Sequence, residues 1–272
     1  MLPAAKAVPK ELLPVLDRPT IQYVIEEAAA GGIAEVLLIS SPQKRAIERH
    51  FQADPELEKR RPELLAGLGD LLARVRIHSV DQPQQRGLGD AVKHARAFVG
   101  DEPFLCQLGD AVFSGDLLPA KQLADAYREL GTAVIGVEEV PPEKVGRYGI
   151  IGGREISPGI WKLDSIVEKP SPASAPSHLA VAARYVLPPA IFDCLDQTPP
   201  GKGGEIQLTD AIQRLLAREP VHAVVLSGKR HDIGSPIDWL KTNLIFAARD
   251  AKLWPLVAPR MRELLDGADT LE

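Results

Sequence analysis

Short apolar runs alternate with amphipathic helical patterns along the first half of this chain. The runs at 35–40 (EVLLIS), 103–108 (PFLCQL) and 132–139 have the length of buried strands, and helical patterns cover 20–30, 56–73 and 117–130. Strands and helices that alternate in this way are typical of a parallel sheet covered by helices. We therefore predict the α/β class, with a Rossmann-like, mixed but mostly parallel sheet flanked by helices.

The second half of the chain has a different pattern. Segments around 148–151, 160–168 and 179–187 have the character of strands but lack long helices between them. This arrangement predicts a mixed or antiparallel extension of the sheet. No internal repeat or low-complexity linker interrupts the sequence, so we expect one α/β domain over 1–248 and a C-terminal helical tail over 249–272.

Composition limits the class of protein. Of the 272 residues 45% are hydrophobic, which is ample for a core, and a formal net charge of -5 gives no basic surface for nucleic acid. Cys106 and Cys194 are far apart within apolar runs, so we predict free thiols in a reducing compartment. The sequence shows no secretory signal and no apolar stretch of about 20 residues. We expect a soluble cytoplasmic protein without membrane or nucleic-acid partners.

The segment PKELLPVLDRP places Lys10 in a stretch that prolines at 9, 14 and 19 make rigid. A rigid loop is a suitable mount for a lysine that contacts a phosphate. The alternative is an ordinary solvated loop charge, and the segment by itself leaves both interpretations open.

A second candidate is QPQQRGLGDAV at 82–92, between an expected strand and an expected helix. Gly87 and Gly89 permit a close approach of the backbone to a ligand, and Arg86 adds a cation. Gln82 carries both a donor and an acceptor, as contact with a base edge requires. The alternative is an ordinary glycine-containing turn.

Two aspartates, Asp110 and Asp232, follow apolar strand-like runs. Ligands of parallel sheets bind beyond the carboxyl ends of the strands, and Mg²⁺ takes a few carboxylates together with substrate phosphate oxygens. Asp110 can instead cap the turn that follows it. His231, beside Asp232, does not indicate a transition-metal site, because no second histidine or cysteine stands at ligand spacing.

The string IVEKP brings Glu168 and Lys169 to the end of an expected strand that Pro170 terminates. One side chain is suited to sugar hydroxyls and the other to a phosphate. A surface Glu-Lys pair is the alternative.

Taken in order, these segments resemble the sugar-1-phosphate nucleotidyltransferases, most closely the bacterial UTP–glucose-1-phosphate uridylyltransferases. The resemblance covers residues 1 to about 248. It rests on MLPAAKAVPKELLPVLDRPTIQYVIEEA, RGLGDAV, VPPEKVGRYGII, VEKPSP, LAVAARYVLPPAIF, TPPGKGGEIQLTDAI and HDIG.

The resemblance implies an enzyme that joins UTP and glucose 1-phosphate, with Mg²⁺ as cofactor, in a homo-oligomer. It implies that Gln82 and Gly87 bind the uracil base, that Lys10 faces the triphosphate, and that Asp110 and Asp232 hold Mg²⁺. It also implies that Gly149, Glu168 and Lys169 bind glucose 1-phosphate, with Lys169 on its phosphate. Glu205 would lie at the sugar side of the pocket.

The resemblance also implies a buried strand and a glycine-rich loop ending in Gly-Thr-Arg ahead of the residue equivalent to Met1. We expect this first strand and loop to be absent, through a start at an internal methionine, and the strand's neighbours to lack a pairing partner. Two functional alternatives stay open: a related transferase that uses dTTP or CTP, and a catalytically silent protein that binds the nucleotide sugar.

Overall fold

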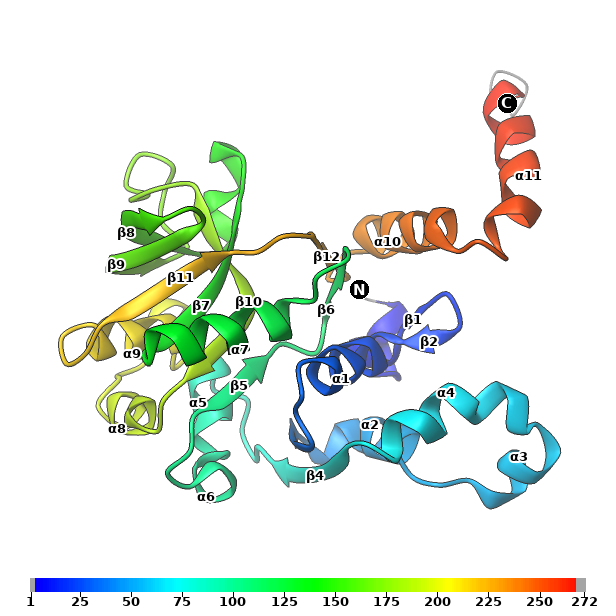
Figure 1. Cartoon of the computed structure of the whole chain (residues 1–272), viewed down its shortest axis with the longest axis horizontal. Helices are drawn as coiled ribbons and strands as arrows, with labels where there is room; N and C mark the ends of the chain where they lie inside the picture. The colour runs from blue at the N-terminus through cyan, green and yellow to red at the C-terminus, as the bar shows by residue number, and fades with distance from the viewer. Residues whose placement is uncertain (1–2, 268–272) are drawn as a thin grey trace.

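The computed structural model describes residues 3–267, an α/β structure built around a six-stranded sheet. Helices cover both faces of this sheet (Figure 1). In sheet order the strands are β5 (Phe104–Gln107), β10 (Leu179–Leu187), β7 (Ala133–Glu139), β11 (Val221–Val225), β9 (Ile160–Glu168) and β8 (Gly149–Ser157).

The sheet is mixed, as predicted. Strands β5, β7, β8 and β11 share one direction, whereas β9 and β10 run the opposite way. Because β10 lies between β5 and β7, and β9 between β11 and β8, most neighbouring strands pair antiparallel although most strands point the same way. Only β7 and β11 pair side by side in parallel within this sheet.

Two groups of helices bury the faces of the sheet. Apolar side chains of α5, α8 and α9 pack on one face, together with β7, β9 and β11. Helix α7 packs on the other face through Leu123 and Ala126. These helices span α5 (Leu88–Lys93), α7 (Pro119–Leu130), α8 (Ala190–Asp196) and α9 (Leu208–Leu215).

Strands β3 (Glu35–Ser40) and β4 (Arg76–Asp81) form a separate parallel pair that packs against helices from the first third of the chain. A helical pattern expected over 56–73 is divided into two helices at Arg61, because the residue before a proline avoids the α-helical conformation. The helices are α1 (Thr20–Ala30), α2 (Arg45–His50), α3 (Pro55–Arg60), α4 (Pro62–Leu72) and α6 (Arg96–Val99).

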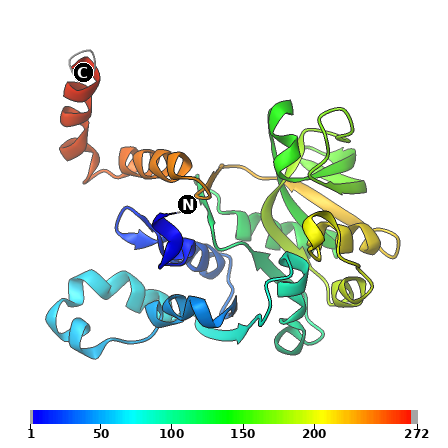
Figure 2. The same cartoon turned by 180° about the vertical axis from the view of Figure 1, so that it is seen from behind.

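Two short antiparallel ribbons connect these parts: β1 (Pro14–Val15) with β2 (Arg18–Pro19), and β6 (Ala111–Ser114) with β12 (Lys229–Asp232). Helices α10 (Pro236–Arg249) and α11 (Trp254–Asp266) then extend away from the sheet, in both views (Figures 1 and 2). The expected tail over 249–272 thus begins where α10 ends, and its last residues, 268–272, lie outside the described residues.

Cys106 and Cys194 are both free thiols, as predicted, and burial raises the pKa of Cys106 to about 12. Within residues 3–267, none of the helices has both the length and the apolar character that a bilayer crossing requires.

Candidate active site

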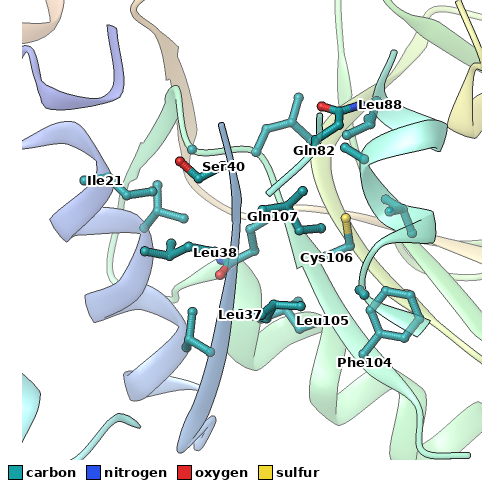
Figure 3. A pocket seen from close by; sticks show the side chains of 18 of the residues that line it. Ile21, Leu37, Leu38, Ser40, Gln82, Leu88, Phe104, Leu105, Cys106 and Gln107 are labelled. Carbon is teal, nitrogen blue, oxygen red and sulfur yellow. The ribbon is translucent and has the colours of Figure 1, made fainter. Parts of the chain in front are cut away.

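A cavity of about 1060 Å³ lies between β3 and β5. Figure 3 shows apolar side chains of α1, β3 and β5 around it, with Gln82 at the end where Ser40 lies. Five of the residues singled out in the sequence line this cavity: Lys10, Gln82, Gly87, Asp110 and Glu205. The structure therefore brings together side chains from segments that are far apart in the chain.

Lys10 and Asp110 meet at one end of this cavity, and Asp232 is close to both although it does not line the cavity. Lys10 opens a short 3-10 helix (Lys10–Leu12), and its Nζ forms an ion pair with Oδ2 of Asp110, just beyond β5. Asp232, the last residue of β12, pairs with Ala111 in the ribbon, and the N–H of Ile233 donates to the carbonyl of Asp110 at 3.3 Å. The ribbon thus places Asp110, which immediately precedes β6, beside Asp232 at the end of β12.

The charge on Lys10 is stabilised by these carboxylates. Burial by itself lowers the pKa of a lysine, because it disfavours the charged form. Burial is the largest single influence at Lys10, but the attraction and hydrogen bond of Asp110, together with the attraction of Glu11 and Asp232, outweigh it, and the pKa lies above its ordinary value. Lys10 is therefore a cation at neutral pH, in contact with one candidate metal ligand.

The loop that contains Gln82 and Gly87 is held by internal hydrogen bonds. Nε2 of Gln82 donates to Oδ2 of Asp90 at 2.8 Å, and Arg86 donates to Oδ1 of the same carboxylate at 2.9 Å. Burial opposes ionisation of Asp90, but the two hydrogen bonds, together with the attraction of Arg86 and His94, outweigh it, and the pKa of Asp90 lies below the ordinary value. Asp90 therefore holds Gln82 and Arg86 in this loop; the sequence analysis did not single it out, although its four-residue spacing from Arg86 could have suggested the pair.

Gly87 has a specific steric reason to be glycine. It precedes α5 with φ 104°, and a Cβ there would lie 2.7 Å from the carbonyl oxygen of Ile206 and 2.8 Å from Cβ of Glu205. The two segments are also joined by hydrogen bonds, from Ile206 N–H to the Arg86 carbonyl and from Gly89 N–H to the Ile206 carbonyl, both at 2.8 Å. Glu205 therefore lies directly beside the glycine loop.

A second group of predicted residues lies on β8 and β9. Gly149 and Glu168 are directly opposite each other in the antiparallel pair, and Lys169 follows with φ 46°, an uncommon conformation for a residue other than glycine. Nζ of Lys169 is 3.3 Å from Oε1 of Glu168. Thr209, which the sequence analysis missed, donates from Oγ1 to Oε2 of Glu168 at 2.7 Å.

The segment from Glu205 to Thr209 connects the two groups. Its first residue lies beside Gly87, and Thr209, in α9, holds Glu168. Gly149 is buried at the same place, where a Cβ would lie 3.1 Å from Oγ1 of Thr209. Gly149, Glu168 and Lys169 do not line the cavity between β3 and β5, so the structure arranges the predicted site as two neighbouring clusters.

The donor set, carboxylate oxygens alone, suits a hard divalent cation better than a transition metal. Among the described residues, no three His, Cys, Asp or Glu side chains gather as a potential metal-binding group. Mg²⁺ commonly binds through one or two carboxylates, water and substrate phosphates. Asp110 and Asp232, which the pairing of β6 with β12 brings close together, could supply carboxylate ligands of this kind.

Comparison with known proteins agrees with this arrangement. The sequence model of the family described as "Nucleotidyl transferase" matches residues 1–248. The UTP–glucose-1-phosphate uridylyltransferase of Staphylococcus haemolyticus is 43% identical over 270 residues, which cover 97% of this chain and 93% of that protein. The enzyme of the same name from Bacillus subtilis is also 43% identical, over 97% of this chain and 92% of its own.

Solved structures extend the comparison to the fold. A UTP-bound UGPase from Acinetobacter baumannii is similar with a TM-score of 0.88 and 36% identity, over 97% of this chain and 94% of that one. A UDP-glucose pyrophosphorylase in complex with UDP-glucose has a TM-score of 0.85 and 34% identity, over 92% and 94% of the two chains. The chain belongs to the nucleotidyl transferase family and, within it, to the bacterial UTP–glucose-1-phosphate uridylyltransferases.

Proposed function

We propose that this chain transfers the uridylyl group of UTP to glucose 1-phosphate, forming UDP-glucose and pyrophosphate. The observation that carries the proposal is 43% identity, across 97% of the chain, with enzymes named for this reaction. The arrangement of charged side chains at the end of the cavity is consistent with two phosphorylated substrates.

We assign the cavity end to the nucleotide. Gln82 and Gly87 would contact the uracil base, because the loop between β4 and α5 presents them beside the cavity. Lys10 would face the triphosphate, where its charge compensates phosphate oxygens. Its ion pair with Asp110 places that charge beside the candidate metal ligands.

Asp110 and Asp232 would hold Mg²⁺. A magnesium ion bound by these carboxylates supplies positive charge to the triphosphate oxygens. The chain's own contribution is to keep two carboxylates and one lysine adjacent through the pairing of β6 with β12.

We assign the second cluster to glucose 1-phosphate. Glu168 would bind sugar hydroxyls, Lys169 would bind the phosphate, and Gly149 leaves room for the sugar beside them. Glu205 would lie at the sugar side of the pocket, since its segment continues to Thr209, which holds Glu168.

The reaction then needs alignment and charge compensation rather than a covalent intermediate. A phosphate oxygen of glucose 1-phosphate attacks the α-phosphorus of UTP, one P–O bond forms, and the bond to pyrophosphate breaks in line with it. The attacking oxygen is already ionised, so no general base is required. Lys10 and Lys169 reduce the repulsion between two anionic substrates, which is the main electrostatic barrier.

The direct test is pyrophosphate release from glucose 1-phosphate with UTP, dTTP or CTP in the presence of magnesium chloride. We expect kcat/KM for UTP to exceed the other two by about tenfold or more. A preference for dTTP or CTP would replace the proposed nucleotide. Binding of UDP-glucose without any pyrophosphate release would indicate a silent binding protein instead.

Two variants test the assigned carboxylates. Asp110→Asn and Asp232→Asn should each lower kcat by about 10²–10³-fold and raise the magnesium concentration needed for half-maximal rate. Asp164→Asn is the matched control, because Asp164 is exposed in the middle of β9. Equal rates for all three variants would remove Asp110 and Asp232 from the site.

A further inference from the structure

The candidate site consists of two clusters that must stand at a fixed distance from each other. The metal-side cluster contains Asp110 and Asp232, and the sugar-phosphate cluster contains Gly149, Glu168 and Lys169. Two phosphorylated substrates react only when the attacking oxygen and the phosphorus atom are about 3–3.5 Å apart. The protein therefore needs side chains that hold one cluster relative to the other.

One such side chain is Arg230, on β12, which the sequence analysis did not single out. It lies two positions before Asp232 and pairs with Phe113 of β6. Only 8% of its side chain is exposed. Nε of Arg230 donates to Oε1 of Glu138, on β7, at 2.7 Å, and Nη2 lies 2.5 Å from the same oxygen. Because a buried cation needs a partner, this ion pair fixes the guanidinium against the main sheet.

The same guanidinium lies over the ring of Tyr148, next to the sugar-phosphate cluster. Its Cζ atom is 4.4 Å from the centre of the ring, which is well within the range of a cation–π contact. Tyr148 directly precedes β8, and its carbonyl accepts a hydrogen bond from the N–H of Lys169 at 2.9 Å. Lys169 has the uncommon φ of 46°, a conformation that persists only where neighbouring groups hold it.

These contacts connect the metal-side cluster to the sugar-phosphate cluster without a break. The backbone of β12 joins Asp232 to Arg230, and the cation–π contact joins Arg230 to Tyr148. The backbone hydrogen bond then joins Tyr148 to Lys169. A displacement of the Arg230 guanidinium would therefore move both ends of the candidate site relative to each other.

We propose that Arg230 is a positioning residue, which sets Lys169 and the sugar phosphate at the distance from Asp232 that in-line attack requires. The inference rests on the proposed uridylyl transfer and extends it to a side chain that acts through other residues rather than on a substrate. Arginine suits this task, because its planar guanidinium can pair with a carboxylate and at the same time stack on an aromatic ring.

A buried pair of arginine and glutamate can also serve stability alone. Loss of Arg230 would then weaken every ligand to the same degree, and its effect would be independent of Tyr148. A positioning role has two different consequences. The effect should fall selectively on the sugar phosphate, and removal of the Tyr148 ring should reproduce part of it.

The test uses Arg230→Met, Tyr148→Leu and the double variant, with steady-state kinetics for each substrate. Tyr148→Leu should raise KM for glucose 1-phosphate by about fivefold, and Arg230→Met by about tenfold. Arg230→Met should also lower kcat by about tenfold, because it loosens the strand that carries Asp232. KM for UTP should stay unchanged. The double variant should match Arg230→Met, since both substitutions remove the same contact.

A binding measurement without turnover provides the second readout. Calorimetric titration compares UDP-glucose, which includes the sugar-phosphate half, with UMP, which lacks it, in the absence of metal. The affinity for UDP-glucose should fall by about tenfold in Arg230→Met and about fivefold in Tyr148→Leu, and the affinity for UMP should not change.

Two control variants accompany these measurements. Tyr148→Phe keeps the aromatic ring under the guanidinium. Arg128→Met makes the same substitution in an exposed pair with Asp125 on α7. Both should keep the wild-type kinetic constants and affinities.

Three results would overturn the proposal. One is a folded Arg230→Met variant with wild-type constants, and another is an equal loss of affinity for UDP-glucose and UMP, which would indicate a general structural role. The third is additive effects in the double variant. If Arg230→Met does not fold, Tyr148→Leu provides the test, because it leaves the pair of Arg230 with Glu138 in place. A wild-type chain without pyrophosphate release would contradict the proposed function instead, and the calorimetric comparison would still decide on Arg230.

Discussion

The carboxylate of Glu27, on α1, and the guanidinium of Arg184, on β10, form a buried ion pair between residues 157 positions apart. Nε and Nη2 of Arg184 each donate to Glu27 at 2.9 Å, and Nη2 also donates to the carbonyl of Ala111 at 2.9 Å. Gln107 donates to the same carboxylate at 2.8 Å. The pair fixes α1 to the main sheet close to Asp110.

Replacement of Arg184 by methionine should strongly destabilise the fold. The substitution leaves the Glu27 carboxylate buried without its cation, which typically costs about 3–5 kcal/mol. Urea unfolding measures the change in the free energy of unfolding. Arg260→Ala removes an exposed pair with Glu263 and should cost at most about 1 kcal/mol. If both variants lost a similar free energy of unfolding, the buried pair would contribute no more to stability than the exposed pair does.

Gly87→Ala should strain the backbone at residue 87 and weaken UTP binding by the loop between β4 and α5. Its φ of 104° is unfavourable for alanine, and the added Cβ meets the Ile206 carbonyl at 2.7 Å. We expect KM for UTP to rise by about tenfold or more, because the loop must shift.

Gly32→Ala is the control for Gly87→Ala. Gly32 has φ 90° but no atom within 4 Å of an added Cβ, so this variant carries the strain without the collision. Its melting temperature should fall while KM for UTP stays unchanged. A comparable rise of KM in both variants would show that strain, not the contact with Ile206, controls the loop.

Thr209→Val should weaken glucose 1-phosphate selectively. The variant keeps the shape of threonine but loses the 2.7 Å hydrogen bond that orients Glu168. A hydrogen bond to a charged group contributes roughly 1.5–3 kcal/mol, so KM for glucose 1-phosphate should rise by about tenfold or more.

The pattern of kinetic constants separates positioning from a general structural effect. KM for UTP should not change in Thr209→Val, and Thr209→Ser should restore the wild-type value because its hydroxyl can still donate. Steady-state kinetics with each substrate varied in turn provides the measurement. Equal changes in both KM values would contradict a positioning role for Thr209.

His222 should make stability depend on pH. It is buried on β11 with Nδ1 2.7 Å from Oγ1 of Thr132, and burial, with a smaller effect of Lys162, lowers its pKa below 6.5. As the pH falls below 6.5, the unfolded chain binds a proton at His222 that the folded chain does not bind. The free energy of unfolding therefore keeps its full value above pH 6.5 and decreases as the pH falls below it.

The matched variant is His222→Gln. Between about pH 7.5 and about pH 5, the free energy of unfolding should decrease more steeply for the wild type than for this variant. Urea unfolding at several pH values measures both slopes. Parallel curves would show that another group titrates in this range.

Local pattern was sufficient for most individual elements. The expected helix over 20–30 and strand over 35–40 correspond to α1 and β3 residue for residue. Each has an apolar pattern of its own period and a clear stop, Gly31 for the helix and Pro42 for the strand. The helical pattern over 56–73 continues through Arg61, so the sequence predicted one helix there, whereas the fold contains two, α3 and α4.

The sequence identified some residues of the candidate site but not others. Lys10 could be selected because a proline-restricted loop suits a lysine that contacts phosphate, and Asp110 and Asp232 because carboxylates after strand-like runs suit Mg²⁺; the fold brings the three close together. Thr209 could not be selected, because nothing in its local sequence indicates that it lies beside Glu168, 41 positions earlier.

The sequence by itself determined the α/β class, the elements and the chemical character of the site, because periodicity and residue type are local properties. Tertiary structure decided that Arg184 is buried against Glu27, that Gly87 lies against the carbonyl of Ile206, and that β3 and β5 line the same cavity. These are properties of contacts between distant segments, and their energies depend on which groups folding removes from water together.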